Sequence, residues 1–541
     1  MRIVKKSIKI VFIIFTITII ISLALYYTII NSPVQVVTKN PDIEKPLTIE
    51  QKLKDFEYMY NILKDNFPFF EVKKRVLGYD WLSRKSEFEE WIKETKNDKE
   101  FYDTMRRILN LLQNGHTHIL SPKTYKDFCE VYNTVSCISG YGPWQQVLNN
   151  KNVVEKYKYW SNIINEDKRY IVPIYFKYIE GKYVADYAIR EKDLEDYGIE
   201  RGSILQKIND LTTKEYIESL KDKEFLKYDF KRNEFKMNQL LISTPDIQVV
   251  KLTFLTPEGK IVERDIKSVV MYTNSPRNIK DMKNFTTAII KKDKIAYIKI
   301  YKFAFDYKKE QEAIYEFLNQ VKNYPYLIID VRGNPGGNDM YWMQNIVAPL
   351  IDKPLKTNYY IVVRNGEYIK PFIKAKFGRF LLSFKSTKEL PTNLNFPKEL
   401  KEDFGKFVCF PKSISPKNPV GFKGKIFLLV DEYVYSSSES FASFAKATKW
   451  ATLVGTATGG DGIGVDPTIC ALPNSGLIFR FPFDMGINPD GTINEEMHTQ
   501  PDIYVEETYK DFINTNELSL GGSFYSNDVV IKKVLKMINE L

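Results

Sequence analysis

The sequence predicts an α/β protein, and two observations support this prediction. From about residue 294 the chain alternates apolar strands with amphipathic helices, with strands over 295–301 and 326–331 that enclose a helix over 307–321. A further apolar run, 426–430, reads as a buried strand that leads through a short turn into a helix. With 541 residues, 44% of them hydrophobic and 14% aromatic, this is a folding chain with the length of about three or four domains.

The N-terminus predicts a membrane anchor. Four basic residues within positions 2–9 precede a run over 10–30 that contains no charged residue. As a helix rising about 1.5 Å per residue, this run spans about 30 Å, the thickness of a bilayer core. We therefore expect a cytoplasmic tail at 1–9, one transmembrane helix at 10–30 and the bulk of the chain outside the cytoplasm, as a single-pass protein of the cell membrane. No A-x-A-like cleavage site follows, but a cleaved signal peptide is the alternative.

Composition argues against several functions. The net charge of +10 is spread along the chain without a basic block, so we do not expect a nucleic-acid partner. The sequence has three histidines, no C-x-x-C pair and no H-E-x-x-H motif, so we do not expect a zinc site. Among four cysteines, Cys129 and Cys137 are close enough in sequence to be bridged in an oxidising exterior.

A helical region is predicted over 48–169, after a proline-containing linker at 31–47. Thr48 to Gln51 form a capping box, apolar residues then recur at helical spacing, and Pro68 ends this first helix. More helix follows, up to a stop at Gly115. Directly after it, His116 and His118 alternate as on one side of a short strand, although two surface histidines are an equally simple reading.

The pattern changes to short strands over 170–268. The stretch 197–210 contains G-x-x-x-G-S-x-L-x-x-I-N, which is close to the G-x-x-x-G-D-x-I-x-x-I-N stretch of a PDZ domain and so resembles it, with Ser203 in place of the usual acidic residue. A helix over 213–220 and a hairpin over 249–266 complete the pattern. PDZ domains bind an extended peptide along a sheet edge. The alternative is a spacer domain of the same fold with a blocked groove.

Two strand-turn-helix motifs stand out in the remaining α/β region. Residues 330–338 read Asp-Val-Arg-Gly-Asn-Pro-Gly-Gly-Asn, a glycine-rich turn whose bare N–H groups suit an anion, without the Lys-Ser/Thr of a phosphate-binding P-loop. The second motif places Ser436 on the turn at a helix N-terminus, where a nucleophile would have amide groups beside it. Each has a structural alternative: a simple turn for the first, and for the second an S-x-x-E capping box formed by Ser436 and Glu439.

Together these signatures resemble the C-terminal processing peptidase (tail-specific protease) family, from about Thr48 to the end. The family has a PDZ domain and a crotonase-like (ClpP/crotonase) α/β core, so the resemblance implies an inserted PDZ-like domain at 170–268 and a peptidase core at 286–506. Within that core, residues 356–424 read as an insertion. The tail at 507–541 closes with an amphipathic helix. The motif at 330–337 and the Ser436-x-x-Glu439 turn carry the resemblance.

The family divides by its catalytic base. One branch places a lysine at the end of a G-x-x-T-x-G-K loop, where this sequence has Asp461. The other branch, similar to the tricorn core protease, uses a histidine supported by a glutamate. Its two segments resemble residues 114–117 and 495–502 here, which implies His116 as base, not His118 or His498, and Glu495 as its support. Asn114 stands for the usual aspartate, and Gly115 for tricorn's serine.

The resemblance implies a serine endopeptidase that hydrolyses polypeptides without a cofactor. Ser436 would attack the peptide carbonyl, His116 would act as general base and acid, and Glu495 would orient it. The oxyanion hole would use the N–H of Ser437 and one from the Gly336-Gly337 turn. The rival readings are a catalytically inactive peptide-binding or regulatory protein of the same fold and a crotonase-like acyl-transfer enzyme.

Overall fold

The structure, a computed structural model, describes residues 2–38, 45–134, 140–164, 168–189, 193–272, 284–394, 396–514 and 528–540. Cys137 lies outside these residues, and so does its predicted bond to Cys129. The chain divides into two compact units, each made of three separate segments. Unit 1 comprises Met1–Ile164, Ile361–Cys409 and Gly464–Met485, and unit 2 comprises Asn165–Tyr360, Phe410–Ile463 and Gly486–Leu541.

Unit 1 is built mainly from helices. Helix α2 (Ile49–Asn66) begins at the predicted capping box, in which the Thr48 hydroxyl accepts a hydrogen bond from the Gln51 N–H and the Gln51 side chain accepts one from the Thr48 N–H. It ends before Pro68, as predicted. The other helices of unit 1 are α3 (Phe70–Leu77), η1 (Leu82–Arg84), α4 (Lys85–Lys93), α5 (Asp98–Asn110), α6 (Pro122–Thr134), α7 (Gly142–Leu148), α8 (Lys151–Ile163), α13 (Lys370–Phe377), η6 (Gly378–Ser383), η7 (Thr387–Glu389) and α14 (Glu399–Glu402).

A small antiparallel sheet in unit 1 joins distant parts of the sequence. Strand β1 (His118–Ile119) pairs with β23 (Ile478–Phe481), which pairs with β22 (Thr468–Ala471). His118 lies opposite Arg480 in this register. His116 precedes β1 and lies in a turn, so the expectation that both histidines lie on one strand is wrong. The Asn114 side chain, which accepts hydrogen bonds from the His116 N–H and the Thr117 hydroxyl, stabilises this turn instead.

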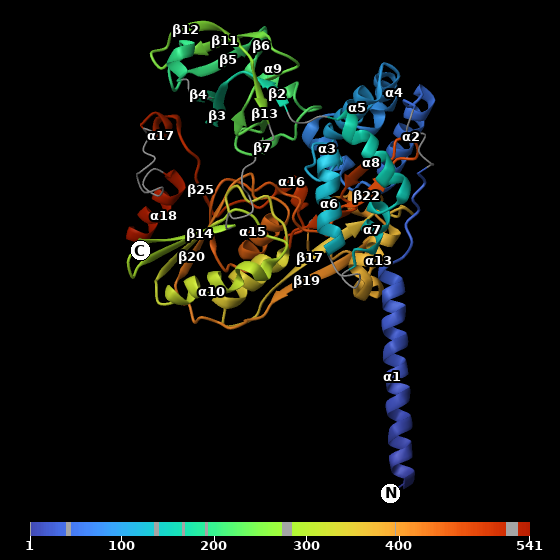
Figure 1. Cartoon of the computed structure of the whole chain (residues 1–541). Helices are drawn as coiled ribbons and strands as arrows, with labels where there is room; N and C mark the ends of the chain where they lie inside the picture. Colours follow the sequence, from blue (N-terminus) through green and yellow to red (C-terminus); the bar gives the residue numbers. More distant parts are fainter. Residues whose placement is uncertain are drawn as a thin grey trace. The chain divides into compact units, whose positions relative to one another are not determined.

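The first helix of unit 1, α1 (Arg2–Ile30), is continuous from the N-terminus (Figure 1). A membrane span needs about 20 consecutive, predominantly apolar residues. In the described part of the chain, no helix has both the length and the apolar character that crossing a bilayer requires. The predicted transmembrane anchor at 10–30 is therefore wrong, and with it the predicted single-pass location in the cell membrane.

A six-stranded sheet forms the centre of unit 2, which confirms the predicted α/β fold. Its strand order is β14-β15-β16-β20-β21-β25, antiparallel between β14 and β15 and parallel across the rest. The strands are β14 (Phe285–Lys291), β15 (Ile295–Ile300), β16 (Tyr326–Asp330), β20 (Lys425–Val430), β21 (Thr452–Gly455) and β25 (Ile503–Tyr504).

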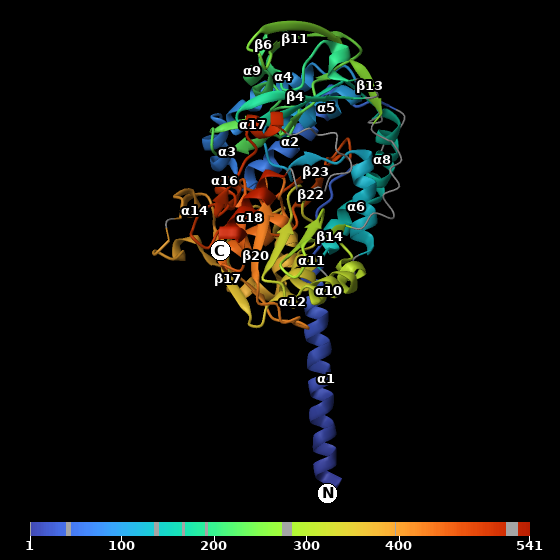
Figure 2. The same cartoon turned by 90° about the vertical axis from the view of Figure 1, so that its left-hand side faces the viewer.

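Helices cover both faces of this sheet (Figure 2). Successive strand residues point to opposite faces, so Ile298 and Leu428 pack against α10 (Gln311–Gln320), α11 (Asp339–Trp342) and α15 (Ser437–Ala447), while Tyr297 and Phe427 pack against α18 (Val529–Glu540). Helix α18 is the predicted closing helix. The remaining helices around the sheet are η4 (Tyr307–Glu310), the π-helical turn η5 (Met343–Val347), α12 (Ala348–Leu350), α16 (Asn494–Met497) and α17 (Tyr509–Asn514).

The second part of unit 2, residues 168–272, is called here the β-domain. Its main sheet has the order β12-β11-β5-β4-β3-β9, with β6 beside β5, and the predicted hairpin is β11 and β12. A separate hairpin, β7–β8, projects from it. The elements are β2 (Lys168–Ile171), β3 (Ile174–Ile179), β4 (Lys182–Ala188), η2 (Leu194–Tyr197), β5 (Ile204–Ile208), β6 (Leu211–Thr212), α9 (Thr213–Glu218), β7 (Lys227–Asp229), β8 (Glu234–Lys236), β9 (Gln239–Leu240), β10 (Ser243–Thr244), β11 (Val249–Leu255), β12 (Ile261–Lys267) and β13 (Val269–Tyr272).

Three further strands each contain a boundary between the two units, so each contributes residues to both. They are β17 (Leu355–Val363), β19 (Lys406–Ile414) and β24 (Asp484–Ile487), which form a sheet with β18 (Lys385–Ser386). The segment 356–424, predicted as an insertion in the core, thus contributes residues to both units.

Candidate active site

Ser436 occupies a strained backbone position at the start of α15. Its φ and ψ angles are 57° and −122°, which few residues other than glycine adopt. Its side chain makes no hydrogen bond to the helix N-terminus, so the alternative reading, an S-x-x-E capping box, does not apply. The Ser438 hydroxyl accepts a hydrogen bond from the Tyr435 N–H. In the described part of the chain the Ser436 hydroxyl has no hydrogen-bond partner, and the residue is partly exposed. A turn of this kind presents a serine hydroxyl as a nucleophile.

Two backbone N–H groups beside Ser436 are unused. Among the described residues neither the Ser437 N–H nor the Gly337 N–H donates a hydrogen bond. The Gly336 N–H is already donated to the Asn334 side chain, at 2.8 Å. A methyl group on Gly336 would lie 2.8 Å from the Ser437 nitrogen and 3.0 Å from the Ser436 Cβ, so the glycine turn packs directly on the serine turn. This arrangement offers two amide donors to an oxyanion, from Ser437 and Gly337.

Buried polar contacts hold the glycine turn in place. Asp330 is fully buried, accepts hydrogen bonds from the Arg332 N–H and guanidinium, and lies 3.3 Å from the Lys299 ammonium. Burial by itself would raise the pKa of Asp330, but the Arg332 guanidinium and the Lys299 ammonium lower it. Asn334 joins the two turns, because its carbonyl oxygen accepts hydrogen bonds from the Ser438 hydroxyl and the Tyr435 N–H.

Glu495 lies at the start of α16, and hydrogen bonds join this helix to α15, the helix that follows Ser436. Asn494, the neighbour of Glu495, donates a hydrogen bond of 2.7 Å to the carboxylate of Glu439, and Thr499 donates another of 2.6 Å. Glu439 lies three residues after Ser436 and is fully buried. Glu495 itself is 7% exposed. The structure therefore brings Glu495 into the same unit as Ser436, on an element anchored to α15.

The β7–β8 hairpin of the β-domain also reaches the serine turn, which the sequence analysis did not anticipate. The Lys236 ammonium forms a buried ion pair with Glu432, at 2.6 Å, and the Phe225 ring contacts the ring of Tyr435 at 6.0 Å between centroids. Farther along the hairpin, the Arg232 guanidinium binds Glu506 at 2.9 Å. The sequence of the hairpin, which mixes aromatic, basic and acidic residues, does not indicate this contact.

Residues 294–505 match peptidase family S41. The chain carries an S41 serine peptidase domain. Among solved structures, two of mature CPAF, one of them complexed with lactacystin, are similar with TM-scores of 0.57 at 13% identity, covering 91% of this chain and 99% and 98% of theirs. The photosystem II D1 C-terminal processing protease is similar with a TM-score of 0.37 at 14% identity, covering 85% of this chain and 94% of that one. The likeness to mature CPAF shows the fold. No curated protein sequence matches the chain.

The three histidines of the protein lie in different surroundings. His116 belongs to unit 1, and so does His118, whose pKa is lowered to about 3 by burial and by the nearby Arg480 and His116. His498 belongs to unit 2, and its Nδ1 lies 2.6 Å from the Thr458 carbonyl oxygen. The ring of His498 also packs edge-on against Phe230, with 4.8 Å between centroids. Only His498 thus shares a unit with Ser436, whereas the motif of the histidine branch selects His116.

Asp461 stands where the lysine branch of the S41 peptidases has its base. It accepts a hydrogen bond of 3.1 Å from the hydroxyl group of Tyr435, the residue before Ser436. A carboxylate at this position supplies no amine for a Ser-Lys dyad.

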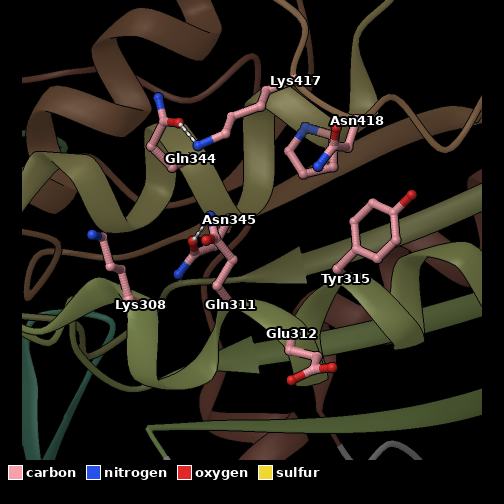
Figure 3. Close-up of a pocket in the computed structure, with 9 residues that line it drawn as sticks. Lys308, Gln311, Glu312, Tyr315, Gln344, Asn345, Lys417 and Asn418 are labelled. Atoms are coloured by element: carbon pink, nitrogen blue, oxygen red, sulfur yellow. Dashed lines mark hydrogen bonds between the residues drawn. The ribbon is translucent and has the colours of Figure 1, made fainter.

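A polar cavity of about 270 Å³ lies elsewhere in unit 2 (Figure 3). Its wall includes the π-helical turn η5, where Gln344 accepts a hydrogen bond from Lys417 and Asn345 accepts one from Gln311. None of the predicted catalytic or oxyanion-hole residues lines it.

Proposed function

We propose that this S41 peptidase hydrolyses peptide bonds in protein or peptide substrates, with Ser436 as nucleophile. The observation that supports this proposal most strongly is the strained serine turn with two unused amide N–H groups beside it. Attack of the Ser436 oxygen on a peptide carbonyl would place negative charge on the carbonyl oxygen, where the Ser437 and Gly337 N–H groups can donate to it.

His116 is the proposed general base and acid, with Glu495 as its orienting carboxylate. The imidazole accepts the Ser436 proton during attack and returns it to the leaving amine, and the carboxylate stabilises the imidazolium between these steps. Water then attacks the ester carbonyl of the acyl-enzyme: His116 takes the proton of the water and gives it to the Ser436 oxygen, whose bond to the acyl carbon breaks as the carboxylic acid is released. The motif matches at 114–117 and 495–502 support these roles. Asn114 fits where the family has aspartate, because its side-chain oxygen accepts the two turn hydrogen bonds that an aspartate would accept.

We also propose that the β-domain is PDZ-like and that the core is crotonase-like. The hairpin β11–β12, the strand β5 after the left-handed Gly198 and the helix α9 support the first assignment. The β3 edge of the main sheet is paired with the chain's own β9. An added peptide strand would need that edge to be open. We infer that an added peptide strand cannot pair with Phe176 and Lys177, which β9 already occupies.

Activity of alanine variants tests the catalytic assignment. We expect Ser436→Ala and His116→Ala each to lower kcat on an unfolded protein substrate by at least about 1,000-fold, while His498→Ala retains most of the activity. Labelling by a fluorophosphonate probe reports on Ser436 directly and should be lost in Ser436→Ala. If wild-type protein neither cleaves nor takes up the probe, the inactive peptide-binding reading holds. If His498→Ala is inactive and His116→Ala is active, the base assignment is wrong.

A further inference from the structure

The β7–β8 hairpin directs two lysines toward the serine turn. In its antiparallel register Lys227 lies directly opposite Lys236, and directly opposed residues of two strands project to the same face. Both lysines contact the turn that follows β20, residues 431–435, and this turn is directly followed by Ser436. Two ammonium groups therefore lie at one short segment next to Ser436.

Only one of these lysines is neutralised by a carboxylate. Lys236 lies 2.6 Å from a Glu432 oxygen, and the other oxygen of that carboxylate accepts a hydrogen bond from Thr456 at 2.7 Å. Both partners are buried. The negative charge of Glu432 is therefore already matched by Lys236.

Lys227 is surrounded by aromatic rings. Its ammonium lies 4.7 Å from the ring centroid of Phe225 and 5.3 Å from those of Tyr433 and Tyr435. Ring faces attract a cation but accept its N–H groups poorly. Among the described residues no oxygen atom lies within hydrogen-bond or ion-pair distance of this ammonium. Phe225 and Tyr433 are 38% and 39% exposed, so a bound peptide can reach them.

We propose that Lys227, with the rings of Phe225, Tyr433 and Tyr435, forms a subsite that binds a carboxylate of the peptide substrate beside Ser436. The inference rests on the proposed peptidase function and names the class of substrate that the site prefers. A partly desolvated ammonium without an acceptor gains most from a charged acceptor, because charge-assisted hydrogen bonds are about twice as strong as neutral ones. The carboxylate can belong to an acidic side chain or to the C-terminus of the substrate.

The charged groups that face Lys227 set the pH range in which the subsite works. These groups are Asp431, Glu432, Glu495 and Lys236. Glu432 is paired with Lys236, and Asp431 accepts hydrogen bonds from the N–H groups of Gly333 and Tyr433. Burial lowers the pKa of Lys227 to about 8, although the carboxylates oppose this shift. The ammonium therefore loses its charge as the pH rises through about 8, and carboxylate binding is lost with it.

Equilibrium binding to the Ser436→Ala protein tests the subsite without requiring turnover. Two pairs of peptides serve as probes: one pair differs by Asp or Asn next to the scissile bond, and the other by a free or amidated C-terminus. We expect the carboxylate member of one pair to bind about 10- to 100-fold more tightly at pH 7. The pair that shows the preference identifies the source of the carboxylate. The preference should decline between pH 7 and pH 9.

Lysine variants of the Ser436→Ala protein show whether the charge at residue 227, rather than that of another lysine of the hairpin, causes the preference. Lys227→Met should reduce the preference to near one, whereas Lys227→Arg should keep it and remove its decline up to pH 9, because arginine stays protonated. Lys231→Met, a change to another lysine of the hairpin, should leave the preference intact. Equal binding within both pairs, or a preference that survives Lys227→Met, overturns the proposal. Fluorophosphonate labelling of the unmutated Ser436 tests the peptidase function independently.

Discussion

At the scale of single residues, backbone strain at Ser436 is the feature on which the site depends. A φ angle of 57° costs a non-glycine residue free energy, of order 1–3 kcal/mol, and such strain persists only where the surroundings hold it. Here the holding contacts are the hydrogen bonds of Ser438 and Asn334 and the close approach of Gly336. The strain turns the hydroxyl away from the helix N–H groups that it would otherwise cap.

Gly336→Ala should strongly reduce activity, because the added methyl group would lie 2.6 Å from the Tyr435 carbonyl oxygen and 2.8 Å from the Ser437 nitrogen. Displacing the serine turn by even about 1 Å should lower kcat/KM by about 100-fold or more. Gly333→Ala is the matched control, since its φ is also positive but nothing lies within 4 Å of its added methyl group. We expect the control to lose about 1–2 kcal/mol of stability and little activity. Equal loss of kcat/KM in both variants would contradict this account.

The sequence predicts the residues of the serine and glycine turns because each is a local strand-turn-helix pattern. Ser436, Ser437, Gly336 and Gly337 lie on such turns, as expected. The sequence does not indicate which of the two glycines can donate its N–H to an oxyanion, because this depends on the hydrogen bond between the Gly336 N–H and the Asn334 side chain. Lys227 was missed for the same reason, since it lies about 200 residues before the turn that it faces. The catalytic roles of His116 and Glu495 stay predictions from a motif.

At the scale of elements, the buried ion pair between Lys236 and Glu432 joins the β7–β8 hairpin to the turn after β20. Burial alone would raise the pKa of Glu432, but the Lys236 ammonium lowers it overall. A buried pair of this kind contributes little net stability over an apolar pair, yet removing one partner leaves an unmatched buried charge. The pair therefore specifies where the hairpin docks.

Lys236→Met should reduce the free energy of unfolding by about 3–5 kcal/mol, because it leaves the Glu432 carboxylate buried without its cation. The double variant Lys236→Met/Glu432→Leu should recover most of that loss. Urea denaturation of the three proteins measures both changes. A double variant that is as unstable as the single one would show that the pair stabilises unit 2 through its charge rather than through packing.

At the scale of the whole molecule, sequence patterns were less reliable. The charge-free run at 10–30 predicted a membrane anchor, and the described helices do not meet the combined length and apolarity that such an anchor needs. Periodicity placed helices and strands well, as the capping box of α2 and the strand β20 illustrate. It carries no information on which distant segments assemble, so the grouping of 361–409 and 464–485 with the N-terminal helices could not be foreseen.

At the same scale, the free energy of unfolding should depend on pH in acid through the protonation of His118. Its pKa is about 3 in the folded protein and about 6.5 in an unfolded chain, so between these values only the unfolded chain binds the proton. Stability is therefore fully present above about pH 6.5 and declines as the pH falls, by up to about 1.4 kcal/mol per pH unit. His118→Gln should flatten this decline in thermal unfolding measured from pH 7 to pH 4. An unchanged slope would contradict the assignment.

Because each unit is made of three separate segments, the two units cannot be separated by cutting or shortening the chain at one place. The backbone passes between the two units five times, at residues 164–165, 360–361, 409–410, 463–464 and 485–486. No single scission releases either unit intact, and a terminal deletion long enough to remove one would also remove parts of the other. Limited proteolysis should therefore leave noncovalently associated fragments rather than two separable domains, and a mapping of function by truncation would misassign it.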